Sequence, residues 1–87
     1  MMYIDAIKEI MLKDEWLQQQ FHESETGRSW VIRHGPGTTQ ISKKLGVSAS
    51  KARYHLNKLH KQGLVNKHAW AGGCVCWFPI GWDYNAK

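Results

Sequence analysis

This chain of 87 residues lacks long apolar runs, a basic leader and a pair of cysteines spaced to form a stabilising disulfide. No run approaches the roughly 18 apolar residues of a membrane-spanning helix, and the first residues lack the basic start and apolar stretch of a secretory signal. The two cysteines, Cys74 and Cys76, are one residue apart and cannot staple a small secreted fold. We therefore expect a chain without membrane contact, located in the reducing cytoplasm.

Acidic residues are absent from the middle of the sequence. Residues 28–68 hold nine Lys and Arg residues and no Asp or Glu, whereas residues 1–27 have a formal charge of −4. A face that only keeps a protein soluble normally mixes both signs, because like charges repel one another. A solubilising face is the alternative, but the pattern favours a polyanionic partner, nucleic acid before membrane or acidic protein.

The length and composition predict one small domain with one core. We divide it into residues 1–35, an acidic helix and connector packed on the same core, residues 36–79, and a tail at 80–87. The front part has apolar residues near helical spacing, which predicts an amphipathic helix of about 15 residues; they are Ile4, Ile7, Met11, Leu12 and Trp16. Residues 22–27 are expected to form a loop, and residues 30–32 a short strand or a helix end.

Two short helices are predicted after the Gly35–Gly37 break. Thr38 suits the N-cap of the first helix, which runs to about Leu45, and Gly46 supplies the left-handed residue that ends it. Ser48 suits the N-cap of the second helix, residues 49–62, which Gly63 stops. Two helices joined by residues 45–48 form a helix-turn-helix.

The second helix has one apolar and one cationic face. Ala49, Ala52, Leu56 and Leu59 fall together at 100° per residue, and polar side chains without any acid fill the opposite arc, with Arg53 and His55 on its flanks. An amphipathic helix that merely faces water is the ordinary explanation, but such helices usually mix Glu with Lys. We therefore interpret the polar arc as a nucleic-acid contact.

A β-hairpin follows the second helix. Residues 64–70 and 74–78 are predicted to form strands around the tight turn Ala71–Gly73, and Pro79 ends the pairing. The expected fold is therefore mainly α with a β-hairpin, an α+β winged helix-turn-helix in which the hairpin, or wing, extends the contact surface beside the second helix.

Residues 36–79 resemble the winged helix-turn-helix DNA-binding proteins of bacteria. Residues 38–48 look like the first two thirds of that motif, and residues 56–65 like its LxxLxxxGLV end. Within the superfamily, residues 51–56, Gly63-Leu64-Val65 and Trp77-Phe78 are similar to the FaeA/PapI-type fimbrial regulators, small DNA-binding proteins that act with a larger global regulator.

The resemblance implies sequence-specific binding of double-stranded DNA and transcriptional regulation in a bacterium or phage. It carries roles over to residues at the start of the recognition helix, namely Ser50, Lys51, Arg53 and Tyr54. With the helix of residues 49–62 in the major groove, we expect base contacts from Ser50, Lys51, Tyr54, Asn57 and Lys58, where Asn suits adenine and Lys suits guanine. Backbone contacts are expected from Thr38, Thr39, Lys43, Lys44, Arg53, Lys61, Lys67 and His68. The wing tip comprises Trp70, Gly72 and Gly73, and Trp70 either stacks on DNA or covers the wing.

Other chemistry is disfavoured. Cys74, Cys76 and His68 offer three metal ligands on one side of the hairpin, but structural zinc sites normally have four ligands, so we expect no metal and no cofactor, and buried cysteines that pack the wing onto the helices. No histidine has an evident nucleophilic partner, and the basic region lacks paired carboxylates, so an enzyme is not expected.

Two alternatives remain open. Winged helices also serve as protein-docking folds, and the acidic N-terminal helix is a candidate surface for a homodimer or for a larger regulator, with little specific DNA binding by this chain alone. RNA is disfavoured because the major groove of an A-form helix is too narrow for side chains to read.

Overall fold

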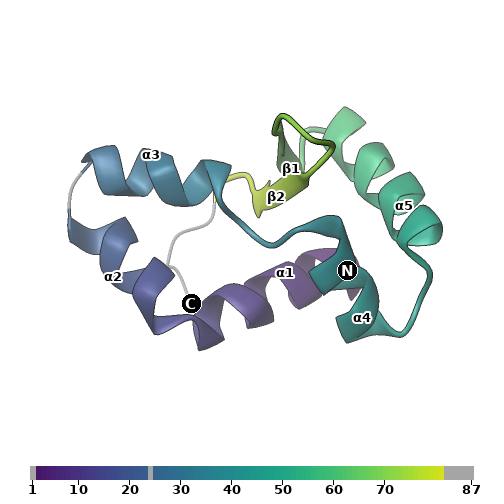
Figure 1. Cartoon of the computed structure of the whole chain (residues 1–87), viewed down its shortest axis with the longest axis horizontal. Coiled ribbons are helices and arrows are strands. Elements are labelled where there is room, and N and C mark those ends of the chain that lie inside the picture. Colours follow the sequence, from purple (N-terminus) through teal and green to yellow (C-terminus); the bar gives the residue numbers. More distant parts are fainter. Residues whose placement is uncertain (1, 24, 82–87) are drawn as a thin grey trace.

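A computed structural model describes residues 2–23 and 25–81 of the chain; most of the predicted tail at 80–87 lies outside the described residues. The elements along the chain are the helices α1 (Met2–Lys13), α2 (Glu15–Glu23), α3 (Glu25–Arg33), α4 (Thr38–Leu45) and α5 (Ala49–Lys61), and the strands β1 (Val65–Ala69) and β2 (Val75–Pro79). The expected α+β winged helix-turn-helix is confirmed. Figure 1 shows α2 and α3 at one end, α4 and α5 at the other, and the hairpin between them, with α1 along one side.

The N-terminal third differs from its prediction. A single helix through Trp16 is wrong, because α1 ends at Lys13 and Asp14 begins a second helix, its Oδ1 accepting from the Leu17 amide at 3.1 Å. A side-chain cap of this kind competes with continuation of the preceding helix. The loop predicted for residues 22–27 is also wrong, since α2 extends to Glu23 and α3 begins at Glu25. Residues 30–32 belong to the last turns of α3.

One face of α1 fills the core. Ala6, Ile7 and Met11 are buried there, whereas Leu12 and Trp16 are 46% and 54% exposed. The prediction from sequence spacing groups all of these apolar residues on one continuous helix. In the structure Leu12 is exposed on α1, and Trp16 belongs to the separate helix α2.

The helix-turn-helix forms as predicted at its turn. Gly46 has φ +70°, and the Val47 amide donates to the Ser42 carbonyl at 3.0 Å, a Schellman ending of α4. Ser48 Oγ accepts from the Lys51 amide at 3.1 Å and caps α5. The predicted N-cap of α4 is wrong by one residue: Gly37 holds that position, and its amide donates to Gln40 Oε1 at 3.1 Å.

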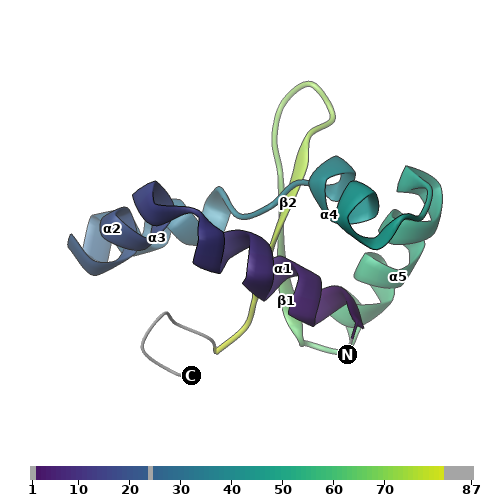
Figure 2. The ribbon, with the colours of Figure 1, turned by 90° about the horizontal axis from the view of Figure 1, so that it is seen from below.

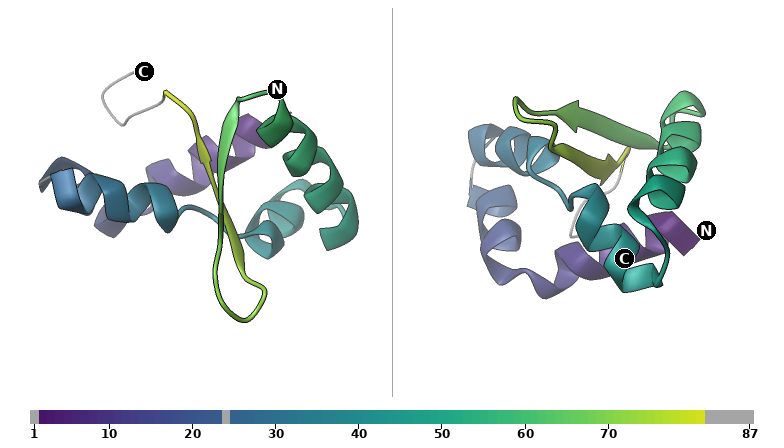
Figure 3. Two further views of the ribbon diagram at one scale, coloured as in Figure 1. Left: turned by 90° about the horizontal axis from the view of Figure 1, so that it is seen from above. Right: turned by 45° about the vertical axis from the view of Figure 1, so that its right-hand side comes forward.

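The hairpin is antiparallel, with Lys67 opposite Trp77 and His68 opposite Cys76. Residues 36 and 37 run beside β2, where the Trp77 amide donates to the Pro36 carbonyl at 3.0 Å and Gly37 bridges Cys76. Figures 2 and 3 show the hairpin between the two helical groups, with its turn extending beyond them. In the part of the chain that the structure describes, no helix has the length and apolar character to span a membrane.

Candidate nucleic-acid interface

The exposed face of α5 carries the residues predicted to contact bases. Ala52, Leu56 and Leu59 are buried and fix the opposite face against the core, while Ala49 is half-buried. Asn57 is half-buried on the side of β1, and the other predicted base contacts are exposed: Ser50, Lys51, Tyr54 and Lys58. Because α5 contains no acidic residue, this face presents cations, hydroxyls and an amide without a carboxylate to repel phosphate.

Tyr54 and Lys58 form a pair on that face. The Lys58 ammonium lies 5.3 Å from the centre of the Tyr54 ring, and Tyr54 is 61% exposed. A cation over an aromatic face is held by the ring quadrupole, here at an exposed site where the attraction is weak. The pair therefore lies on the exposed surface of α5.

A chain of contacts joins α5, the wing and α4. Lys67 Nζ donates to Asn57 Oδ1 at 2.9 Å, and the same ammonium lies 5.7 Å from the centre of the Trp77 ring. Trp77 is fully buried, and its Nε1 donates to Thr38 Oγ1 at 2.9 Å. The three elements expected to face DNA are thereby connected to one another within the protein itself.

A hollow of about 310 Å³ lies between the start of α4, α5 and the wing. Thr39 and Arg53, both expected at the DNA backbone, line it together with Cys76. Thr38 also lines it, but its hydroxyl oxygen already accepts from Trp77. The structure thus brings Thr39 and Arg53 to one concave surface beside the wing.

The two lysines at the end of α4 have different environments. Lys43 is exposed, whereas Lys44 Nζ lies 3.0 Å from Glu9 Oε2 of α1. Lys44 is therefore directed toward α1, and its charge is already paired. Lys61 is exposed at the end of α5.

The wing tip is attached to α3. Trp70 Nε1 donates to the Arg33 carbonyl at 3.1 Å, and its ring lies 4.5 Å from the His34 ring and 4.3 Å from that of His68. His34 in turn stacks on Trp30 at 3.7 Å. Of the two roles open to Trp70, covering the wing is the one that these contacts support. Gly72 and Gly73, with φ of +91° and +88°, form the exposed turn beyond it.

The cysteines are less buried than expected. Cys74 is exposed, which makes the predicted packing role wrong for that residue, and Cys76 is half-buried. Burial raises the pKa of the Cys76 thiol, a hydrogen bond with Trp70 lowers it, and the neighbouring Cys74 raises it; the net direction is upward. Across residues 2–23 and 25–81, no group of three potential metal ligands comes together.

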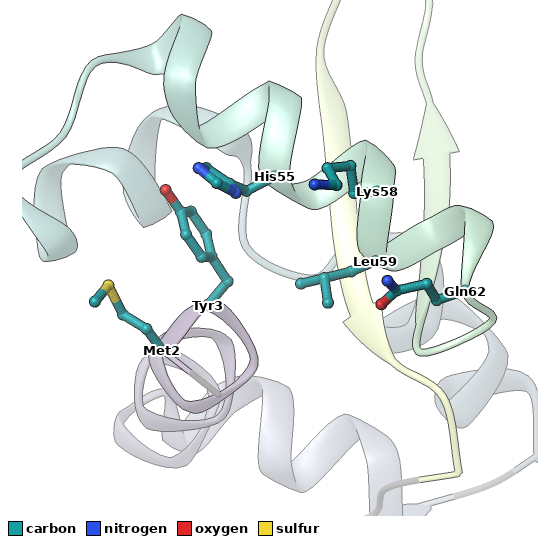
Figure 4. A pocket seen from close by; sticks show the side chains of 6 residues that line it. All are labelled: Met2, Tyr3, His55, Lys58, Leu59 and Gln62. Carbon is teal, nitrogen blue, oxygen red and sulfur yellow. The ribbon is translucent and has the colours of Figure 1, made fainter.

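The inner flank of α5 faces α1 across a second hollow of about 350 Å³, lined by Met2, Tyr3, His55, Lys58, Leu59 and Gln62. Figure 4 shows Tyr3 rising from α1 toward His55, and the two rings stack at 5.1 Å. His55, expected on a flank of the polar arc, is therefore directed toward α1. Lys58, which lies on the exposed face of α5, also lines this hollow.

Several residues of the interface were missed from the sequence. Trp30, Arg33 and His34 support the wing, and Glu9 pairs with Lys44. The spacing of Trp30 and His34, four residues apart, is a detectable signal once residues 25–33 are taken as a helix. The Glu9 contact depends on how α1 packs on α4 and has no local signal.

Comparison with known proteins gives one family. Residues 38–67 match the family model of bacterial regulatory proteins of the arsR family. The match covers about a third of the chain and includes α4, the turn, α5 and the start of β1. It does not confirm the FaeA/PapI-type resemblance. Neither the curated proteins nor the solved structures give a match to this chain.

The matched family consists of DNA-binding regulators and not of enzymes, in agreement with the expectation from the sequence. It supports DNA as a partner and transcription regulation as the general function. Residues 38–67 thus carry a helix-turn-helix similar to that of the arsR family of bacterial regulatory proteins.

Proposed function

We propose that this protein binds double-stranded DNA in a sequence-specific manner and regulates transcription, with α5 in the major groove and the hairpin on the backbone. The observation that carries the proposal is the division of α5 into two faces. Leu56 and Ala52 are fully buried, while the opposite face exposes cations and hydrogen-bonding groups without a carboxylate. A helix anchored in this way can enter a groove without losing its core contacts.

Base contacts are assigned to the outer face of α5, with Lys51 and Tyr54 at its N-terminal half. Backbone contacts are assigned to exposed residues around it, such as Thr39, Lys43, Arg53 and Lys61. Base contacts set sequence preference, whereas backbone contacts set register and overall affinity. The resemblance to the FaeA/PapI-type regulators supports a further expectation, a larger regulator as partner.

Fluorescence anisotropy tests the proposal directly. The protein is titrated with a random DNA duplex, a single strand and an A-form RNA duplex at about 50 and about 200 mM salt. We expect tight, salt-sensitive binding with preference for the DNA duplex. No binding even at low salt would contradict it and would indicate that the cationic face meets an acidic protein.

Variants then separate base reading from backbone contact. Lys51→Ala or Tyr54→Ala should relax sequence preference, because each removes a group from the outer face of α5. Lys61→Ala should weaken all duplexes alike and reduce the salt slope by about one unit. Equal losses on selected and random duplexes from all three variants would contradict this assignment.

A partner surface on the N-terminal helices is a second candidate function. Trp16 is 54% exposed, meets Trp30 edge-on at 4.9 Å, and lines with it a hollow of about 360 Å³ between α2 and α3. Exposed aromatic residues are enriched in protein interfaces. Removal of residues 1–20 would be a poor test, because Ile7 and Met11 are fully buried.

Light scattering of Trp16→Ser and of the unaltered chain avoids that problem. Loss of a dimer, or of a complex with a co-purified regulator, in the variant alone would support the partner surface. An unaltered chain that is monomeric and binds no regulator would contradict it.

A further inference from the structure

The contact between Asn57 and Lys67 joins the recognition helix to the wing. Lys67 Nζ donates to Asn57 Oδ1 at 2.9 Å across ten residues of sequence. Lys67 also contacts Trp77: the two residues lie opposite each other in the hairpin, and the Lys67 ammonium lies 5.7 Å from the centre of the Trp77 ring. Trp77 itself is fully buried and bonded to Thr38. Lys67 therefore packs on a side chain, Trp77, that is itself fixed by burial and by a hydrogen bond.

The chemistry of the contact determines how the amide is turned. A lysine ammonium has three donors and no acceptor, so only the oxygen of the Asn57 carboxamide can face it. The NH₂ group of Asn57 must then point away from Lys67. Together the two side chains present an NH₂ group and an ammonium, both of them donors, and the amide oxygen is turned toward Lys67, which takes one of its two lone pairs.

This arrangement changes which base Asn57 can select. The bidentate contact of Asn with adenine requires an acceptor for N6 and a donor for N7, whereas guanine offers two acceptors, N7 and O6. We propose that the pair of Asn57 and Lys67 selects guanine, and that Lys67 is the positioning residue that prevents Asn57 from reading adenine. The proposal rests on the proposed function, in which α5 lies in the major groove.

Selection from a randomised duplex library tests the proposal. The base position contacted by Asn57 is identified as the one whose preference is lost in Asn57→Ala. At that position we expect the unaltered protein to favour guanine over adenine by about tenfold, within the range of a good side-chain contact to a base. Lys67→Met, which keeps the stem over Trp77 but removes the donor, should let the amide turn and shift the preference toward adenine.

Two control variants isolate the effect. Lys67→Arg keeps a donor-only side chain and should retain guanine. Lys61→Met removes one exposed cation from α5 and should weaken binding to all sequences without changing the preferred base. The same preferences in Lys67→Met and Lys61→Met would overturn the proposal while leaving DNA binding intact. Absence of duplex binding by the unaltered protein would instead overturn the proposed function and this inference with it.

The hydrogen bond between Lys67 and Asn57 can be observed without DNA. The side-chain amide resonances of Asn57 should shift in Lys67→Met and stay near their original positions in Lys67→Arg, as followed by ¹⁵N-resolved NMR. An unchanged Asn57 amide in a folded Lys67→Met protein would overturn the proposal whatever the library shows.

Discussion

The salt dependence of DNA binding follows from which cations of the interface are unpaired. Five residues assigned to the backbone are cationic, namely Lys43, Lys44, Arg53, Lys61 and Lys67. Lys44 is paired with Glu9 at 3.0 Å and directed toward α1, and Lys67 donates to Asn57 and is assigned above to base selection, which leaves three. Each phosphate contact contributes a slope of about −0.9 in log K against log salt, so we expect a slope of about −2.7. Raising the salt from about 50 to about 200 mM should then weaken binding by about 40-fold.

The two lysines at the end of α4 form a matched pair for this prediction. Lys43→Met should make the slope less steep by about 0.9, whereas Lys44→Met should leave it nearly unchanged, as measured by anisotropy at four or five salt concentrations. The ion pair of Lys44 is exposed on the Glu9 side, and exposed pairs contribute little to stability. Both variants should therefore unfold at nearly the same urea concentration as the unaltered protein. Equal changes of slope in the two variants would refute the argument, because the ion pair would then not hold Lys44 away from DNA.

Three further predictions concern the wing. Gly35→Ala should destabilise the fold by about 1–3 kcal/mol in urea unfolding, because its Cβ would collide with the Trp77 carbonyl oxygen. Gly37→Ala, with its nearest contact at 3.7 Å, is the matched control: it should lose only the preference for Gly over Ala at the N-cap of α4, less than about 1 kcal/mol, and an equal loss in both would contradict the packing argument. Trp77→Phe should cost about 1–3 kcal/mol in the same assay through the lost hydrogen bond to Thr38 and the vacated space, and a change below about 0.5 kcal/mol would contradict it. Cys76 should react with iodoacetamide more slowly than Cys74 and need higher pH, because burial raises the pKa of its thiol and the thiolate is the nucleophile; single Cys→Ser variants measured from pH 7 to pH 9 would show equal rates if this were wrong.

The part of the fold that could be predicted from the sequence is the part specified by local signals. Gly46 and Gly63 adopt positive φ at the ends of α4 and α5, and Ser48 caps α5, as their positions indicate. These residues act on neighbours within four positions, so a linear sequence displays them. The antiparallel hairpin around residues 71–73 follows from the same kind of evidence.

The N-terminal helices could not be predicted in this way. Gly27 reads as a loop residue because glycine weakens helices, but it is buried within α3, where tertiary packing outweighs propensity. Asp14 lies inside an apparently continuous apolar pattern, and its role as a cap becomes visible only in the fold. Helices of nine residues, such as α2 and α3, depend on packing against each other more than on their own propensity.

In the candidate site, too, local features could be predicted from the sequence and contacts between distant elements could not. Exposure of Lys51 and Tyr54 follows from helical periodicity, which a wheel displays correctly. The pairing of Lys44 with Glu9 and the link between Asn57 and Lys67 join elements that are distant in sequence, so no periodicity reveals them. The sequence therefore predicts which residues face outward, but not which of them already contact another side chain of the protein.

Two contacts within the protein hold the wing in the absence of DNA, and one of them involves the N-terminal helices. Lys67 ties the wing to α5, and Trp70 ties its tip to the end of α3 through the Arg33 carbonyl. Binding costs less conformational entropy when loops and side chains are already ordered, so these contacts favour affinity. Because α3 lies outside the segment that matches the arsR family model, the support of the wing tip comes from the part of the chain that this comparison does not cover. A partner that moved α3 would therefore act on the wing directly, through Trp70 and His34, without touching α5.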